Sequence, residues 1–365
     1  MAYTNIDDPS AHFQAFTYTG TGTNNSITLD GNSDLQPDLY WYKTRSNSNY
    51  HYLADSSRGT TNYIYPNDSL VEGTGYTGYV QSFDTNGVTV GAGDSGTNTN
   101  GTTFANWVWK ANGGTTSSNT DGSITSTVQA NQDAGFSIVT FTGDSSGSVQ
   151  TIGHGLGVAP DVIITKTRTV ADSWFVYHKN LSSTPVNSYI SLNTTAAVGS
   201  ITGYWSTTAP SSTVYGVITN PGQLGYSNNK NNTPMLAYCF AEKQGYSKFG
   251  SYIGNGFANG PFVYTGFKPA FVMFKRSTGS QSWDIHDSTR DPFNPMPRRL
   301  LPNLAYEEET RPTSGVSIDC MDFLSNGFKI RSIETILNAS GDTFVYMAFA
   351  ENPFVTSTGI PTTAR

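Results

Sequence analysis

The segment Leu35–Arg45 reads LQPDLYWYKTR, and its counterpart VAPDVIITKTR lies 123 residues further on, at Val158–Arg168. The same separation relates Phe16–Gly20, FTYTG, to Val139–Gly143, VTFTG. A second offset, of 109 residues, relates the second segment to a third, and its pairs are Pro160 with Pro269, Lys166 with Lys275, Trp174 with Trp283, Phe240 with Phe349 and Glu242 with Glu351. Because each offset holds over a long stretch of chain, the sequence predicts three tandem repeats.

The repeats share an order of features. An aromatic strand that ends in Gly leads to a Gly-rich turn, and a Pro then opens a strand that ends in Lys. These structural landmarks are Pro37, Lys43, Pro160, Lys166, Pro269 and Lys275. Twelve residues after each Lys stand Asp55, His178 and Asp287, and the two Asp are followed at i+3 by Arg58 and Arg290. The second repeat differs in its His and in lacking a Phe-x-x-Asn-Gly turn, which weakens the case for a site shared by all three.

The strand segments are short, rich in aromatic and β-branched residues, and bounded by Gly, Pro and Asn, which is typical of β-strands and hairpins. We therefore predict an all-β fold of three tandem antiparallel β-sandwich domains, jelly-roll or lectin-like in type. Each unit is long enough to bury a core of its own. The predicted boundaries are 1–112, 135–245 and 246–354, with a Gly/Ser/Thr-rich linker or edge strand at 113–134 and a tail at 355–365.

Composition narrows the class of protein. Only 13% of the 365 residues are charged, 13% are aromatic, and the net charge is −7. No basic stripe is present, so a nucleic acid partner is not expected. The N-terminal residues lack the pattern of a secretory signal, and no apolar run is long enough for membrane insertion. The two cysteines, Cys239 and Cys320, are expected to be buried free thiols. We expect a chain made in the cytoplasm.

Several sequence motifs of the repeats together resemble those of a known protein family. Its residues are the Tyr-Thr-Gly and Lys-x-Arg motifs, HGLGVAPD at His154–Asp161, AYCFAE at Ala237–Glu242 and GYSKFGSYIGNG at Gly245–Gly256. The chain resembles tail-fibre-type structural proteins of marine bacteriophages, such as cyanophages, over about residues 13–354. The resemblance implies a virion structural protein with exposed surfaces, and it carries no catalytic residues over to this sequence.

We expect no enzyme activity, no cofactor and no metal site. Gly93–Gly96 and Gly143–Gly147 contain Gly-Asp-Ser, as in serine proteases, but a triad needs a His and a buried Asp in one place, and Gly-Asp-Ser is also turn composition. The repeated acids, Asp38 and Asp161 among them, are expected to brace turns. The five His residues lack zinc-ligand spacing.

Two places are candidates for contact with a partner. Tyr204 and Trp205 lie among Thr, Ser and Gly, without a counterpart in the other repeats, and could stack on a sugar or another chain. The loop Asp291–Gly315 is rich in Pro and contains Arg298, Arg299 and a triple Glu run. A long loop of this kind is either a docking element or a solvated insertion, and Arg298 and Arg299 are the expected contacts.

The most favoured function is a tail fibre or tail-associated protein that recognises the host, with other virion proteins as partners, assembly as a homo-oligomer and a host surface glycan as a possible ligand. The first alternative is a capsid decoration or cement protein. The second alternative is a free carbohydrate-binding module.

Overall fold

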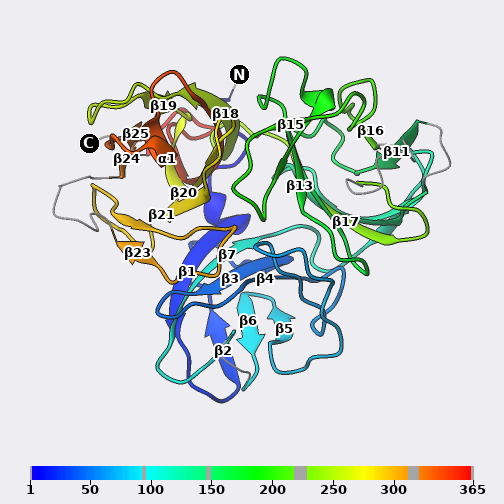
Figure 1. The fold of residues 1–365 in the computed structure, drawn as a ribbon. Helices are drawn as coiled ribbons and strands as arrows, with labels where there is room; N and C mark the ends of the chain where they lie inside the picture. Colours follow the sequence, from blue (N-terminus) through cyan, green and yellow to red (C-terminus); the bar gives the residue numbers. More distant parts are fainter. Residues whose placement is uncertain (1, 93–95, 145–148, 218–227, 311–319, 363–365) are drawn as a thin grey trace.

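The computed structural model describes residues 2–92, 96–144, 149–217, 228–310 and 320–362. The fold is all-β, with several antiparallel sheets. In Figure 1 the chain forms three lobes around a common centre, coloured blue to cyan, green, and yellow to red in sequence order. Within the described ranges, no helix is both long and apolar enough to cross a membrane.

The first repeat contains two sheets. A short 3-10 helix, η1 (Pro9–Ala11), precedes them. The larger sheet has the order β1-β7-β3-β4 and the smaller one β2-β6-β5. The strands are β1 (Phe13–Thr19), β2 (Asn25–Thr28), β3 (Leu39–Thr44), β4 (His51–Asp55), β5 (Val80–Asp84), β6 (Gly87–Val90) and β7 (Thr103–Trp109).

The second repeat has a sheet of order β15-β14-β13-β12-β17-β10-β9-β8 and a pair β11-β16. Its elements are β8 (Ser117–Asn119), β9 (Ser126–Asn131), β10 (Phe136–Thr142), β11 (Gln150–Gly153), β12 (Val162–Thr167), β13 (Phe175–His178), η2 (Pro185–Asn187), β14 (Ser188–Ser191), β15 (Gly199–Ser200), β16 (Val214–Val217) and β17 (Pro234–Phe240). Because β9 pairs with β10, the segment 113–134 supplies edge strands, which was one of the two alternatives for it.

The third repeat has the sheets β18-β26-β20-β21 and β19-β25-β24, and a small pair β22-β23. Its elements are β18 (Ser247–Ile253), β19 (Phe262–Tyr264), β20 (Phe267–Arg276), β21 (Trp283–Asp287), β22 (Arg298–Arg299), β23 (Glu309–Thr310), β24 (Met321–Leu324), β25 (Gly327–Ile330), α1 (Thr335–Asn338) and β26 (Thr343–Pro353).

Strand pairing confirms that the offsets in the sequence mark equivalent strands. In the three large sheets, Trp41 pairs with Trp107, Ile164 with Tyr238 and Met273 with Met347. Lys43, Lys166 and Lys275 are each the last residue but one of their strands. Pro37 and Pro160 precede β3 and β12, whereas Pro269 lies inside β20 at a β-bulge, where the missing N–H of proline is tolerated.

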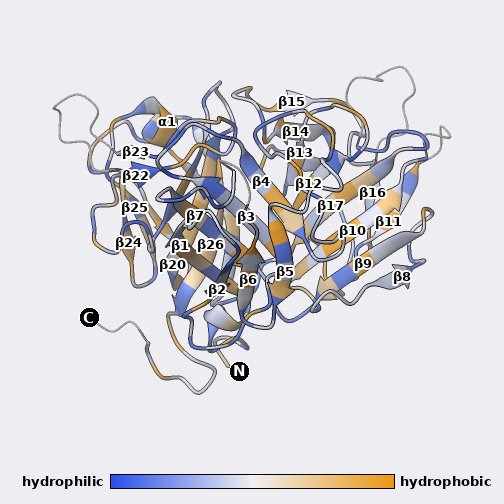
Figure 2. Ribbon diagram, turned by 90° about the horizontal axis from the view of Figure 1, so that it is seen from below, coloured by the Kyte–Doolittle hydropathy of each residue, from blue (hydrophilic) through white to orange (hydrophobic). Residues whose placement is uncertain are grey.

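Alternating side chains of the large sheets enter two different cores. On β3, Leu39 and Trp41 belong to a cluster shared by all three repeats, while Tyr40 and Tyr42 belong to a cluster of the first repeat alone. The second and third repeats divide their strands in the same way. In Figure 2 the apolar colour follows the strands of the interior and the polar colour the loops. Both faces of these strands are buried, which explains why their sequences are apolar almost without interruption.

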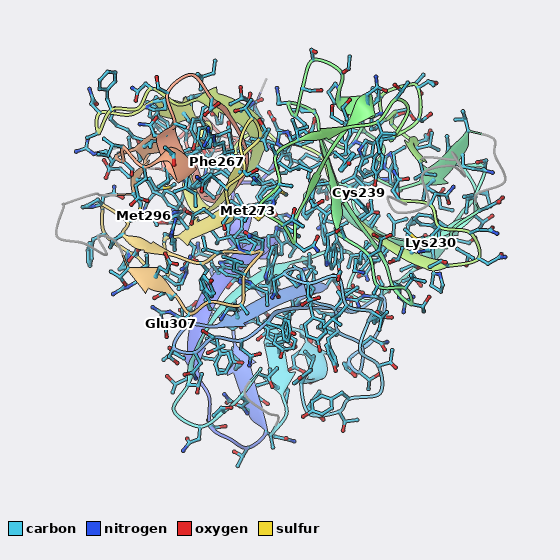
Figure 3. The ribbon with its side chains drawn as sticks, in the orientation of Figure 1. Lys230, Cys239, Phe267, Met273, Met296 and Glu307 are labelled. Atoms are coloured by element: carbon cyan, nitrogen blue, oxygen red, sulfur yellow. The ribbon has the colours of Figure 1, made fainter. Side chains whose placement is uncertain are left out.

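The shared core corrects one expectation. The units were expected to bury cores of their own, and each does so in part, but the inner faces of the three large sheets depend on one another. Met273 of β20 lies at this centre in Figure 3. A cavity of about 20 Å³ remains there, lined by apolar side chains of all three repeats, including Trp41, Tyr238 and Met347. The repeats therefore form one packed body rather than beads on a string.

Candidate functional site

The segments that follow β4, β13 and β21 each cross to another repeat. The first loop accepts a hydrogen bond at Tyr65 O from Trp174 Nε1, at 2.7 Å. The second accepts one at Ser191 O from Trp283 Nε1, at 2.8 Å. The third closes the ring, since Asn49 N of the first repeat donates to Ala305 O at 2.7 Å. The three junctions thus run from the first repeat to the second, the second to the third, and the third back to the first.

A buried carboxylate bridges two repeats at the first junction. Glu72 Oε1 lies 2.5 Å from Arg58 Nη1 of its own repeat, and Glu72 Oε2 lies 2.7 Å from Arg168 Nη2 of the second repeat. The Glu72 N–H also donates to Arg168 O at 2.7 Å. Arg58 is held in turn by Asp55 Oδ2 at 2.6 Å. We call this arrangement of Arg, Glu and Arg a clasp.

The third junction repeats the clasp with other residues. Glu308 Oε2 lies 3.1 Å from Arg290 Nη1, and Glu308 Oε1 lies 2.8 Å from Arg45 Nη2 of the first repeat. The Glu308 N–H donates to Arg45 O at 2.8 Å. Burial alone would raise the pKa of Glu308, but the Arg45 hydrogen bond and the charge of Arg290 outweigh it and hold the pKa below its usual value.

At the second junction the three clasp positions hold uncharged residues. Leu181 stands at the position of Arg58 and Arg290, and Ser277 at that of Arg45 and Arg168. Val198 N donates to Ser277 O at 2.9 Å, which is the same backbone bond that Glu72 and Glu308 make. Leu181 is buried in the shared core, and Val198 packs against it. Because all three positions are uncharged at this junction, no charge is left buried without a partner.

Each junction has a second contact, in which a hydrogen-bonding side chain is paired with a suitable partner in the other repeat. Tyr238 Oη donates to Asp55 Oδ2 at 2.7 Å, and Trp107 Nε1 donates to Asp287 Oδ2 at 3.0 Å. The equivalent of Trp107 and Tyr238 in the third repeat is Met347, which has no N–H or O–H to donate. His178 replaces Asp here, and its Nε2 lies 3.1 Å from the carbonyl oxygen of Tyr346. This explains the departure of the second repeat at His178.

The three landmark lysines are fully buried at the junctions. Lys43 Nζ donates to Thr44 O at 2.6 Å, Lys166 Nζ to Ser69 O at 3.2 Å, and Lys275 Nζ to Thr195 O at 3.2 Å. Burial lowers the pKa to about 7 for Lys43 and to about 8 for each of the other two. An amine with such a pKa is a competent nucleophile. These amines are sealed from solvent, however, so they cannot meet a substrate.

Tyr204 and Trp205 were predicted to form a contact site for a sugar or another chain. This prediction is wrong, because neither ring lies at the surface. Trp205 is 1% exposed and Tyr204 is fully buried, both in the core cluster of the second repeat. Trp205 Nε1 donates to Ser188 O at 2.9 Å, which satisfies the polar edge of the ring. Surrounding Thr, Ser and Gly residues suggested a loop on the surface, but the segment folds beneath β13 and β14 side chains such as Tyr177 and Tyr189.

The predicted docking pair is corrected in part. Arg299 is buried and bonded to Asp284 Oδ2 at 3.1 Å and to Glu309 Oε2 at 2.7 Å, so it is not free for a partner. The Arg298 side chain is 40% exposed and lies 3.1 Å from Asp291 Oδ1. Residues 311–319 of the loop lie outside the described residues. The described part does dock, but onto the first repeat of its own chain, where Figure 3 places Glu307.

Sequence comparison places the chain in a family. A family model with the description "Domain of unknown function (DUF7483)" matches residues 8–353. The chain belongs to the DUF7483 family. The match spans all three repeats, so the DUF7483 domain is the whole ring rather than one of its units. No curated protein matches the chain. No solved structure matches it either.

Other titratable groups of this DUF7483 chain brace its turns. Asp38 accepts hydrogen bonds from the N–H groups of Ala111, Gly113 and Gly114, at 2.7 to 2.9 Å. Asp161 accepts one from Glu242 N at 2.7 Å. Among the described residues, no group of three or more His, Cys, Asp or Glu side chains could hold a metal ion. The Ser of each Gly-Asp-Ser motif, Ser95 and Ser145, lies outside the described residues.

Sequence reasoning missed the two clasp glutamates. Glu72 and Glu308 occupy the same place in the loops of the first and third repeats, each bonded to the Arg of its Asp-x-x-Arg motif. The signal was weak because the loops differ in length, with 14 residues from Arg58 to Glu72 and 18 from Arg290 to Glu308. A fixed offset therefore cannot detect the pair. An Asp-x-x-Arg motif followed by a Glu in a loop of variable length would have been the signature to search for.

Proposed function

We propose that the chain is a non-enzymatic structural protein of a bacteriophage virion, built from three β-sandwich repeats of jelly-roll or lectin-like type. One observation carries this proposal: the acids and bases that recur in repeat register are used in contacts that hold the repeats together. The carboxylates of Asp55 and Asp287 and the amine of Lys43 are buried at junctions. Groups placed in this way stabilise a fold, and these buried carboxylates are not open to a substrate as a pair acting on a glycosidic bond would have to be.

The ring form supports attachment at a threefold position of a particle. The three repeats are arranged around one centre (Figure 1). A chain with internal threefold pseudo-symmetry matches a partner that is itself threefold, because equivalent faces can then meet equivalent faces. A tail-associated protein for host recognition is the first placement, with other virion proteins as partners and a host glycan as ligand. A homo-oligomer would have to use outer faces, because the junctions between repeats are already closed.

The same pseudo-symmetry favours a second placement, as a decoration or cement protein on a capsid. An icosahedral shell presents many threefold positions, so a chain of this shape could cover them. In both placements the protein would be made in the host cytoplasm and end at the surface of the virion.

The test is the protein content of purified particles of the phage that encodes this chain. Quantitative mass spectrometry of density-banded virions should find the chain, and electron microscopy should locate it. Tens of copies or fewer would indicate the tail, and hundreds would indicate the head. Absence from banded particles, with the chain recovered free in the lysate, would contradict the proposal and favour a free carbohydrate-binding module. Hydrolysis of host polysaccharide, abolished by a single acid-to-amide change, would contradict its non-enzymatic part.

A further inference from the structure

A polar pocket of about 440 Å³ opens where the N-terminal segment crosses the boundary between the second and third repeats. Its lining consists of residues 2–6 together with His12, Asp133, Lys243 and Gln244. Pockets that hold small ligands have volumes of roughly 300–1,000 Å³. The lining comes from three separate parts of the chain, so the pocket exists only in the closed ring.

The N-terminal wall of the pocket is held in place from both sides. Thr4 Oγ1 donates to Gln244 O at 2.7 Å, and Tyr3 Oη donates to Gly266 O at 2.7 Å. Gly245, next to Gln244, has a φ of +79°, and a Cβ there would lie 2.8 Å from Thr4 Cβ. Glycine is therefore required at this crossing. The wall is fixed in advance of any ligand, which lowers the entropy cost of binding.

His12 presents a defined donor. Asn131 Oδ1 accepts from Ala134 N at 3.0 Å, so the Asn131 amide nitrogen faces His12, where Nδ2 lies 3.2 Å from Nδ1. His12 Nδ1 is then an acceptor, and the proton is on Nε2. Burial first, and then the charge of Lys110, lower the pKa of His12. The imidazole is neutral at neutral pH, with its Nε2–H free of any partner in the described part of the chain.

Asp133 and Lys243 differ from the acids and bases of the junctions. Neither the Asp133 carboxylate nor the Lys243 ammonium makes a hydrogen bond or ion pair with another described residue, although both line one pocket. The pocket thus offers a neutral N–H donor, a cationic donor, an anionic acceptor and the amides of Asn5 and Gln244, with no net charge. It contrasts with the clasps, where every charge is matched.

We propose that this pocket binds a neutral saccharide unit of a glycan. A sugar hydroxyl both donates and accepts, so a ring bearing several hydroxyls can satisfy a lining that mixes donors and acceptors. A phosphate or nucleotide would meet Asp133 with like charge, and an apolar ligand would leave the polar groups of the lining desolvated and unpaired. The assignment of the glycan to a host surface rests on the proposed function, but the binding site itself does not.

Binding is tested on the full-length chain with the methyl glycosides of glucose, galactose, mannose and N-acetylglucosamine, by saturation-transfer NMR and titration calorimetry. At least one glycoside is expected to bind. The double variant Asp133→Asn, Lys243→Gln should weaken that binding by at least about tenfold, because two charge-assisted hydrogen bonds are lost. Asp133 is exposed and Lys243 is half-buried, and neither side chain loses a partner among the described residues, so thermal unfolding should be unchanged. Asp34→Asn, an exposed acid outside the pocket, is the matched control and should bind normally.

Two results would overturn the inference: no binding of any of the four glycosides, or binding that the double variant leaves unchanged. Binding of a zwitterion such as glycine betaine in place of the glycosides would also overturn it, since it would show a different ligand class. The outcome is separate from the test of the virion proposal. A chain found in particles that binds no glycoside refutes only the pocket, and a chain that binds glycosides but is absent from particles refutes only the virion.

Discussion

The hydroxyl of Tyr238 lies 2.7 Å from Asp55 Oδ2 and joins the closing strand of the second repeat to the end of β4 in the first. The residue at this position decides what its partner must be. Trp107 also donates to an Asp, whereas Met347 cannot donate, and at that junction His178 lies against the neighbouring backbone carbonyl of Tyr346. Each junction is therefore a matched set, and a change on one side alone should be costly.

Replacement of Tyr238 by Phe tests that match. Asp55 would keep Arg58 but lose a hydrogen bond in a fully buried place, so the free energy of unfolding should fall by about 2 kcal/mol. Urea unfolding measures it. Tyr264→Phe, which removes a hydroxyl from a half-exposed side chain, is the control and should cost less than about 0.5 kcal/mol. If the two changes lowered the free energy of unfolding equally, the hydrogen bond to Asp55 would add no more stability than that of an exposed hydroxyl.

Placing the three charged residues of a clasp at the second junction tests whether these positions depend on one another. Val198→Glu alone places a carboxylate against the apolar shared core and should destabilise the chain by about 3 kcal/mol or more. Val198→Glu with Leu181→Arg and Ser277→Arg supplies both partners and should recover most of that loss. The coupling energy from the single, double and triple variants is the readout. Additive losses would refute the equivalence of the three junctions.

The buried lysines make stability depend on pH. Burial lowers the pKa of Lys43 to about 7, against about 10.4 for an unfolded lysine. Between these values the unfolded chain holds a proton that the folded chain has lost, so the free energy of unfolding should rise from pH 7 to pH 9. The slope is at most about 1.4 kcal/mol per pH unit for one lysine.

The variant Lys43→Met isolates this contribution. It should show a shallower rise between pH 7 and pH 9 than the wild type, because one of the three titrating groups is gone. The control Lys268→Met removes a half-exposed lysine and should leave the slope as it is. A slope that Lys43→Met does not change would mean that Lys43 stays protonated in the folded chain.

Arg299 and Arg298 should differ although they are neighbours. Arg299→Ala leaves Asp284 buried without its cation, so the expected loss of stability is about 3 kcal/mol. Arg298→Ala removes a half-exposed guanidinium, while Asp291 keeps the hydrogen bond from the backbone N–H of residue 298, so the cost should be about 1 kcal/mol or less. Thermal and urea unfolding measure both. If Arg299→Ala leaves stability intact but abolishes assembly with a partner, the internal role assigned to Arg299 is wrong.

The sequence predicted features that depend on short-range pattern. The equivalence of Lys43, Lys166 and Lys275 followed from constant offsets, and the Asp55–Arg58 pair followed from i+3 spacing in a loop. Both depend on residues close in the chain or fixed in register. The all-β class followed in the same way, from the length and composition of the strand segments.

The joining of the repeats could not be predicted in this way. Leu39 and Tyr40 are both apolar, and no pattern along β3 says that one faces the shared core and the other the core of the first repeat. Trp205 was misplaced for a similar reason, since its polar neighbours said nothing about the strands that cover it. The His12 pocket was missed because its walls lie more than a hundred residues apart in sequence and meet only when the ring closes.

Equilibrium unfolding followed by hydrogen exchange tests the central claim most directly, namely that three repeats share one core and unfold together. In increasing urea, slow amides of β3, β12 and β20 should become exposed at one common midpoint, and the m-value should be that expected for the surface of the whole chain. Three separate midpoints, each with an m-value near one third of the total, would show that the repeats are independent domains and would contradict the account.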